Sequence, residues 1–121
     1  MQIKEIDAEF TVCKVQQLSD IDLSLPFTFC AVTDEEVSLV CPTECVPALT
    51  TAREDGWKAF RIRGELDFGL VGILARIAAI LAENGIPVYV MSTYNTDYVL
   101  VKHVKFVNAL RLLKENGYEI V

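Results

Sequence analysis

Several features that mark membrane, secreted and disordered proteins are missing from this sequence of 121 residues. No apolar run is long enough to span a bilayer, and the amino-terminal segment "MQIKEIDAEF" lacks the basic-then-apolar order of a signal peptide. Proline and glycine are few, whereas 52% of the residues are hydrophobic, which is enough apolar mass for a real core. We therefore expect a compact cytoplasmic protein that folds alone or as a small oligomer.

Positive charge is also scarce. Lysine and arginine number 11 against 17 aspartates and glutamates, so the formal net charge at pH 7 is −6. The phosphates of nucleic acids and anionic lipid headgroups repel a chain of this charge. The composition therefore predicts no nucleic-acid partner and no membrane partner.

Residues that hold metals or perform catalysis are few. The only histidine, His103, has no cysteine or serine motif to pair with, and "CPTEC" lacks the second pair of ligands that a zinc site needs. No glycine-rich phosphate loop occurs. We predict no metal, no cofactor and no enzymatic activity, the alternative being an acid–base trio of Tyr94, Asp97 and His103. All four cysteines stand in apolar, strand-like runs, as small core residues do: Cys13, Cys30, Cys41 and Cys45.

An internal repeat is the most informative feature that is present. Residues 25–59 match residues 86–120 without a gap at a constant shift of 61, so that Leu39, for example, falls on Leu100. The repeat predicts the same supersecondary unit twice. A helical i, i+3, i+4, i+7 stripe occurs in both copies: Cys45, Ala48, Leu49 and Ala52, then Phe106, Ala109, Leu110 and Leu113.

Each copy is predicted to form a strand, a turn, a strand, a helix and a strand. The second copy has strands at "IPVYVMST", "DYVLVK" and "YEIV" and a helix over residues 104–115. The first has strands at "LPFTFCAV", "EVSLVC" and "WKAFRIRG" and a helix over about residues 43–54, after an earlier strand at "EFTVCKVQ". Asp55-Gly56, Asn84-Gly85 and Asn116-Gly117 are each expected to end a helix with a left-handed glycine.

A further helix is predicted at "GLVGILARIAAILAENG", residues 69–85, which is apolar around most of its circumference. With the strand before it, this helix completes a strand-helix-strand-strand-helix-strand unit, the split βαβ of a ferredoxin-like fold. We therefore predict an α+β protein with two repeats. The N-terminal unit, residues 1–60, has its first helix reduced, and the C-terminal unit spans residues 57–121, with a strand at 57–63 that either unit could use.

A helix that is apolar around most of its circumference is expected to be buried against other elements on two sides. One side packs on the sheet, and the other, around Gly72, Arg76, Ala79 and Glu83, carries small residues that allow a second helix to approach closely. We predict a homodimer through this face, with a partner inside the same chain as the alternative.

The segment "GELDFGLVGILARIAAILAENGIPVYVMSTYNTDYVLVK" resembles the ACT domain, a small βαββαβ regulatory module that binds amino acids. The whole chain resembles the tandem-ACT proteins of the CASTOR-like group, related to a cytosolic arginine sensor. An L-x-F pattern before a Gly-Ile helix start and the segment "STYNTDY" carry the resemblance, and the first half joins it through the repeat and "CPTECVPAL". The resemblance implies a sensor that binds a free amino acid and acts on a regulated protein partner.

The resemblance also implies where the amino acid binds. Amides at the helix entry would hold its carboxylate, and the polar segment after "YVM" would hold its ammonium group with hydroxyls, carbonyls and one carboxylate. Arginine-sensing members carry an acidic residue where this chain has Leu70, so an apolar or small amino acid is expected. The predicted ligand-binding residues are Asp67, Phe68, Gly69, Leu70, Val71, Gly72, Ile73, Ser92, Thr93, Tyr94, Asn95 and Asp97.

Other interpretations of the same residues exist. The polar run can be an ordinary five-residue hairpin loop, with Asn95 in the left-handed region and Asp97 capping its own turn. The chain would then be a ligand-free ACT-like dimerisation or protein-interaction module. RNA-recognition domains share the βαββαβ plan, but "DYVLVK" and "FRIRG" do not supply the aromatic and basic residues that those domains place on their central strands.

Overall fold

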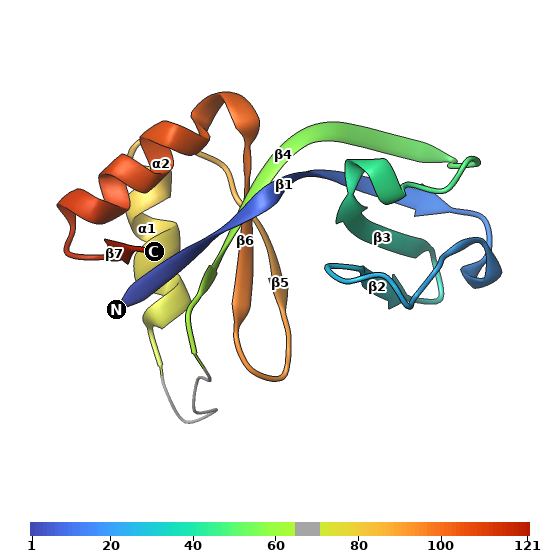
Figure 1. Cartoon of the computed structure of the whole chain (residues 1–121), viewed down its shortest axis with the longest axis horizontal. Helices are drawn as coiled ribbons and strands as arrows, with labels where there is room; N and C mark the ends of the chain where they lie inside the picture. Colours follow the sequence, from blue (N-terminus) through green and yellow to red (C-terminus); the bar gives the residue numbers. More distant parts are fainter. Residues whose placement is uncertain (65–70) are drawn as a thin grey trace. The chain divides into compact units, whose positions relative to one another are not determined.

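The computed structural model describes residues 1–64 and 71–121, which form an α+β, ferredoxin-like fold (Figure 1). The described residues divide into two compact units. One, here called the helical unit, comprises Met1–Asp7 and Lys58–Val121, and the other, the strand unit, comprises Ala8–Trp57. The elements are β1 (Gln2–Val15), η1 (Leu18–Asp20), β2 (Phe29–Val32), β3 (Val37–Pro42), η2 (Thr43–Cys45), β4 (Ala52–Ile62), α1 (Ile73–Glu83), β5 (Tyr89–Ser92), β6 (Asp97–Lys102), α2 (His103–Glu115) and β7 (Glu119–Ile120).

Two long strands, β1 and β4, contribute residues to both units. The sequence predicted only the second part of β1, and it predicted β4 only from Trp57 onward. The assignment of residues 1–60 and 57–121 to two ACT-like domains stays a prediction.

The helical unit has the strand order β7-β1-β4-β6-β5. Gln2 and Ile3 of β1 pair in parallel with Glu119 and Ile120 of β7, and the Arg63 N–H donates to the Gln2 carbonyl at 3.0 Å. The last predicted strand is therefore present but short, and it pairs with β1. The sheet and both helices share one core, whose fully buried members include Ile3, Phe60, Ile62, Ile77, Leu81, Val101 and Leu113.

Both α-helices end in the same hydrogen-bonded motif. At the end of α1, Gly85 has a φ of 71°, and the Ile86 N–H donates to the Leu81 carbonyl at 3.0 Å. The end of α2 repeats this arrangement around Gly117, whose φ is 94°, with Tyr118 as the donor. These are Schellman motifs, in which a left-handed glycine lets the chain reverse and cap its own last carbonyls. The two predicted helix ends at Asn84-Gly85 and Asn116-Gly117 are confirmed.

The strand unit has the order β2-β3-β1-β4 and repeats the hairpin of the helical unit at a shift of 60. Val32 pairs with Val37 in the first hairpin, and Ser92 pairs with Asp97 in the second. The predicted shift of 61 is therefore wrong by one residue in the hairpins. A one-residue slip moves every side chain of a strand to the opposite face, so matching by identity alone assigned the wrong equivalences.

The helix predicted over residues 43–54 is absent. Only the short turn η2 forms, and Val46 after it is extended, with φ −64° and ψ 131°. Pro47 explains this, because the residue before a proline is disfavoured in the helical region and proline lacks the N–H that a helix interior needs. Leu49, assigned to the buried stripe of that helix, is 78% exposed.

Gly56 does not end a helix either, because it lies inside β4 with a φ of 87°. Beside it, Asp55 accepts a hydrogen bond of 2.6 Å from the hydroxyl of Thr11, which is 0% exposed. The Thr11 oxygen also lies 2.9 Å from the Thr43 hydroxyl, and since Thr11 donates to Asp55, Thr43 is the donor in this pair. These bonds join β1, η2 and β4 within the strand unit.

The cysteines fall into two groups. Cys13 and Cys41 are buried in a small core with Leu39, and the half-buried Cys45 packs against this core. Cys30 is exposed on β2, so its predicted place in the core is wrong. Burial raises the pKa of the Cys41 thiol to about 12, and burial also raises the pKa of Cys13. Within residues 1–64 and 71–121, no cluster of three or more histidine, cysteine or acidic side chains could hold a metal ion. No helix in the same residues is long and apolar enough to cross a membrane.

Thiol labelling at pH 8 should distinguish the cysteines. We expect Cys30 to react first with an aromatic disulfide reagent, because it is exposed, and Cys13 and Cys41 to react only when the protein is unfolded. Mass spectrometry after cleavage at glutamate reads the order, because Glu35 and Glu36 separate Cys30 from Cys41. Labelling of Cys41 as fast as Cys30 in the folded protein would contradict the buried core.

Replacing Thr11 by valine should destabilise the protein by about 1–3 kcal/mol, because the Thr43 hydroxyl loses its buried acceptor and Asp55 loses a donor. Urea unfolding measures the change. The matched control is Thr51→Val, which removes an exposed hydroxyl at 3.4 Å from the Lys14 carbonyl and should cost much less. Equal losses of unfolding free energy in the two variants would show that the buried hydrogen bonds of Thr11 stabilise the protein no more than the exposed one of Thr51.

Candidate functional site

The first turn of α1 contains backbone N–H groups that make no hydrogen bond within the helix. Gly72 is the N-cap, with a φ of 80°, and it has no side chain that could cap the helix. The first intrahelical bond runs from the Arg76 N–H to the Gly72 carbonyl at 3.0 Å. The amides of Ile73, Leu74 and Ala75 therefore have no partner within the helix, and the positive end of the helix dipole lies at the same place.

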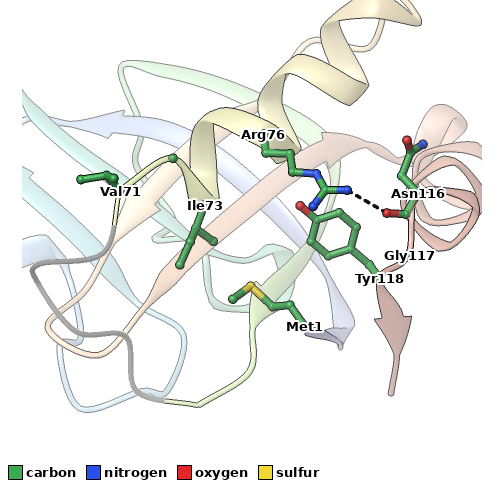
Figure 2. A pocket seen from close by; sticks show the side chains of 8 residues that line it. Met1, Val71, Ile73, Arg76, Asn116, Gly117 and Tyr118 are labelled. Carbon is green, nitrogen blue, oxygen red and sulfur yellow. Dashed lines mark hydrogen bonds between the residues drawn. The ribbon is translucent and has the colours of Figure 1, made fainter.

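A hollow of about 280 Å³ lies beside this turn, within the helical unit. Figure 2 shows its walls: the start of α1 on one side, the turn between α2 and β7 on the other, and the first residue of the chain below. We call it the α1 hollow. Its lining residues are Met1, Val71, Gly72, Ile73, Arg76, Asn116, Gly117 and Tyr118.

Arg76 provides the positive charge of the α1 hollow. Its Nη2 donates to the Asn116 carbonyl at 3.1 Å, and its guanidinium carbon lies 5.4 Å from the centre of the Tyr118 ring (Figure 2). Tyr118 is itself 6% exposed and belongs to the core. The arginine is thus held by a carbonyl at the end of α2 and by a rigid aromatic face.

The sequence does not predict most of this wall. Arg76 is named there only as part of the helix face that is predicted to pack on a second helix. The other unpredicted lining residues are Met1, Asn116, Gly117 and Tyr118. The one local signal was a single arginine placed one turn after the helix start. The rest depends on the turn between α2 and β7, which a Schellman motif brings beside α1.

The polar run after β5 forms a compact turn. Ser92 and Asp97 are the last pair of the β5–β6 hairpin, and the Ser92 hydroxyl donates to Asp97 Oδ1 at 2.5 Å. The Thr93 N–H donates to the Thr96 carbonyl at 2.8 Å. The interpretation that places Asn95 in the left-handed region is wrong, since Phe27 is the one non-glycine residue with a positive φ in the described part of the chain.

Part of this polar run has a purely structural role. Thr96 is 8% exposed, and its hydroxyl donates to the Ile62 carbonyl at 2.8 Å, which ties the turn to the end of β4. In the strand unit, the Thr33 N–H donates to the Glu36 carbonyl at 2.9 Å, the same bond that Thr93 makes with Thr96. The two threonines at the turn are therefore explained without a ligand.

The structure brings together some of the predicted ligand-binding residues. Val71, Gly72 and Ile73 line the α1 hollow. Figure 1 shows the β5–β6 turn at the same end of the helical unit as the start of α1. The predicted residues Asp67, Phe68, Gly69 and Leu70 lie outside the described residues. Those in the β5–β6 turn are not among the residues that line the α1 hollow: Ser92, Thr93, Tyr94, Asn95 and Asp97.

Among curated proteins, the chain is similar to the cytosolic arginine sensor for mTORC1 subunit 1 of Mus musculus. The two are 38% identical over 71 residues, which are 58% of this chain and 21% of the mouse protein. The chain thus spans about a fifth of the length of that relative.

Three solved structures share the fold. A protein from Agrobacterium tumefaciens superposes with a TM-score of 0.86 at 24% identity, covering 99% of this chain and 91% of its own. A protein of unknown function from Vibrio cholerae, described as a possible transport protein, gives 0.72 at 25% identity over 94% and 88%. The α and β subunits of an aspartokinase give 0.62 at 16% identity over 95% and 96%.

The model of the ACT domain family matches residues 52–115, just over half of the chain. The matched segment contains β4, both α-helices and the β5–β6 hairpin. Of the residues that line the α1 hollow, it includes Val71, Gly72, Ile73 and Arg76. On this match and this fold, the protein belongs to the ACT domain family.

Proposed function

We propose that the protein is a regulatory sensor that binds a free amino acid at the start of α1. The observation that carries the proposal is the geometry of the first turn of α1. Its backbone N–H groups make no hydrogen bond within the helix, and they lie beside the α1 hollow, which Arg76 also lines. Membership of a regulatory domain family supports it, as does the similarity to a protein named as an arginine sensor.

The carboxylate of the amino acid accepts hydrogen bonds from the amides of Ile73, Leu74 and Ala75. A helix N-terminus favours an anion through these donors and through the helix dipole. Arg76 adds a full positive charge one turn further on. Its hydrogen bond to the Asn116 carbonyl and its contact with the Tyr118 ring hold it in place before a ligand arrives. A donor fixed in advance loses less conformational entropy on binding.

The ammonium group of the amino acid binds at the β5–β6 turn, which lies at the same end of the helical unit as the start of α1 (Figure 1). Asp97 supplies the negative charge. One of its oxygens accepts from Ser92, and a carboxylate has further acceptor sites that remain usable. The exposed side chains of Tyr94 and Asn95 would then cover the bound ligand.

The side chain of the ligand is apolar or small. Met1, Val71 and Ile73 supply apolar lining in the α1 hollow, and the guanidinium of Arg76 repels a cationic side chain. Arginine is for this reason the least suitable ligand, even though the mouse relative is named for it.

Binding would change the surface around the start of α1, which a second copy or a regulated protein partner recognises. We place this sensor in the cytoplasm, as the name of the mouse relative suggests, and we expect a homodimer without catalytic activity.

A ligand-free interaction module is the second candidate. The observation that favours it is the turn of the strand unit, where Thr33 makes the same bond as Thr93 without a helix entry beside it. Under this alternative the polar turn only shapes the hairpin.

Calorimetry and thermal unfolding with each of the twenty amino acids distinguish the two candidates. One or a few small or apolar amino acids should bind, and at 100 times its Kd a ligand stabilises the native state by about 2.7 kcal/mol. Arg76→Gln should abolish this gain. The matched control, Arg111→Gln, removes an exposed arginine paired with Glu115 on α2 and should leave binding unchanged. If no amino acid gives heat or stabilisation with the unmodified protein, the sensor proposal fails.

Asp97→Ala tests the ammonium site separately. The ligand found by calorimetry should lose at least tenfold in affinity, because its positive charge loses its partner, while the unfolding midpoint without ligand changes little. Asp34→Ala in the corresponding turn of the strand unit is the control and should bind normally. Unaltered affinity in Asp97→Ala would remove the β5–β6 turn from the site but leave the helix entry in it.

A further inference from the structure

One face of the sheet in the helical unit carries a group of positive charges. Phe60 and Ile62 of β4 belong to the core that the sheet shares with both α-helices, so Arg61 between them lies on the opposite face. Lys4 follows the core residue Ile3 on β1 and lies on that same face. A lysine and an arginine of neighbouring strands therefore share the face that is turned away from the helices.

The register of β1 and β4 places these two side chains opposite each other. The Arg63 N–H, just after the end of β4, donates to the Gln2 carbonyl at the start of β1, so the strands are antiparallel. Two residues further along each strand, Lys4 lies opposite Arg61. The Arg63 side chain joins them, since its Nη1 donates to the Gln2 side-chain oxygen at 3.2 Å. We call Lys4, Arg61 and Arg63 the basic face.

The charges of the basic face are not balanced by ion pairs. Within the part of the chain that the structure describes, none of its three cations forms an ion pair with a carboxylate. Glu119 also lies on this side of the sheet, opposite Gln2, and it accepts a hydrogen bond from the Gln2 amide at 3.4 Å. Like charges directly opposite each other on neighbouring strands destabilise a sheet. A bound anion would relieve this repulsion.

Arg61 is held in place before any partner binds. Its Nη1 donates to the Tyr98 hydroxyl at 3.0 Å, and its guanidinium carbon lies 5.8 Å from the centre of the Tyr98 ring. Tyr98 stands on the same face as Arg61, because its neighbour Val99 belongs to the core on the helix side. A guanidinium has five N–H donors, so the bond to Tyr98 leaves others for a carboxylate.

We propose that the basic face binds an acidic segment of a partner protein, in which carboxylates occupy alternate positions of an extended chain. Arg61 and Arg63 are two residues apart, which is about 7 Å on an extended strand. Side chains on one side of an extended segment repeat at the same distance, so Glu-x-Glu or Asp-x-Asp brings one carboxylate to each arginine. Lys4, about 5.5 Å across from Arg61, attracts the same carboxylates.

Other anions fit the basic face less well. A nucleic-acid strand is repelled by the net charge of −6 of the chain. The Tyr98 ring, which a base could use for stacking, already contacts Arg61. A single phosphate cannot reach both arginines in the way that two carboxylates at matching distance can.

A second copy of the chain is also a poor occupant. Its acidic run Asp34, Glu35 and Glu36 is exposed, but the Thr33 N–H donates to the Glu36 carbonyl and closes this run into a tight turn. The Thr33 hydroxyl accepts from the amides of Glu35 and Glu36 and holds the turn further. The run therefore does not present carboxylates at alternate positions of an extended strand.

Fluorescence anisotropy with a labelled peptide of alternating glutamate and threonine tests the proposal on the whole chain. We expect saturable binding that weakens as salt is added. Arg61→Gln and Arg63→Gln should each lower the affinity about tenfold, because a charge-assisted hydrogen bond is lost. The matched control, Lys114→Gln, removes the same charge from an exposed position of α2 and should bind normally.

Two further peptides test the spacing and the charge. A peptide with glutamine in place of every glutamate should not bind. A peptide with the same composition, but with its glutamates in one block, should bind more weakly, because half of its carboxylates point away from the sheet. The proposal is overturned by equal affinity for the blocked and alternating peptides, by normal binding in both arginine variants, or by no binding at all.

Competition and gel filtration examine the other occupants. Displacement of the peptide by inorganic phosphate, or tighter binding of a single-stranded oligonucleotide, would give the basic face to a phosphate ligand and overturn the proposal. Self-association of the unmodified protein that Arg63→Gln abolishes would give it to a second copy, with the same consequence.

Thermal unfolding without any ligand provides an independent readout. Lys4→Gln should raise the unfolding midpoint, because it removes a positive charge opposite Arg61, whereas Lys114→Gln should not. A lowered midpoint in Lys4→Gln would show that the cations are not in conflict and would contradict the basic face as an anion site. Circular dichroism checks folding, and if Arg61→Gln does not fold, the exposed Lys4 and Arg63 variants decide the peptide test. None of these results needs an amino acid, so this proposal and the sensor proposal can fail separately.

Discussion

Hydrogen bonding between β1 and β4 is the interaction on which both units depend. These two strands are 14 and 11 residues long, and both contribute residues to the helical unit and to the strand unit. In the helical unit the Arg63 amide bonds to Gln2, and in the strand unit the Thr51 amide bonds to Lys14, near the two ends of β1. The strand unit can therefore form a four-stranded sheet although its helices are reduced to η1 and η2. Its core is correspondingly small, built around Cys13, Leu39 and Cys41.

The sequence predicts the parts of the fold that are decided locally. Both α-helices carry an apolar stripe and end at Asn-Gly, and each end is a Schellman motif. The sequence does not predict the elements whose structure depends on residues far apart in the chain. The first half of β1 has Ile3 and Ile6 buried three residues apart, which breaks the alternation that marks a strand, and its partner β7 lies at the other end of the chain. The stripe over residues 45–52 has helical spacing but contains Pro47, so proline outweighs the pattern.

In the candidate site, too, the sequence predicts the residues that depend on a local pattern and misses those brought together from distant parts of the chain. The helix entry at Val71–Ile73 follows from a glycine before an apolar helix and from the family resemblance, and these residues line the α1 hollow. Arg76 and Tyr118 meet only because the turn after α2 comes beside α1, which no local pattern indicates. Of the polar residues after β5, Thr93 and Thr96 serve the turn itself, and Ser92 is bonded to Asp97. The hydroxyls that look most like ligands in the sequence are thus partly structural.

Ligand binding in the proposed sensor therefore depends on hydrogen bonds from the backbone amides of Ile73, Leu74 and Ala75 to the carboxylate of an amino acid. Nuclear magnetic resonance of the ¹⁵N-labelled protein observes these three amides directly while a mixture of the twenty amino acids, and then each one singly, is added. We expect saturable shifts of these amide signals with at least one small or apolar amino acid, together with a shift of the Arg76 side-chain signal. Signals at these positions that do not move with any amino acid, or that move only elsewhere in the protein, would contradict the account.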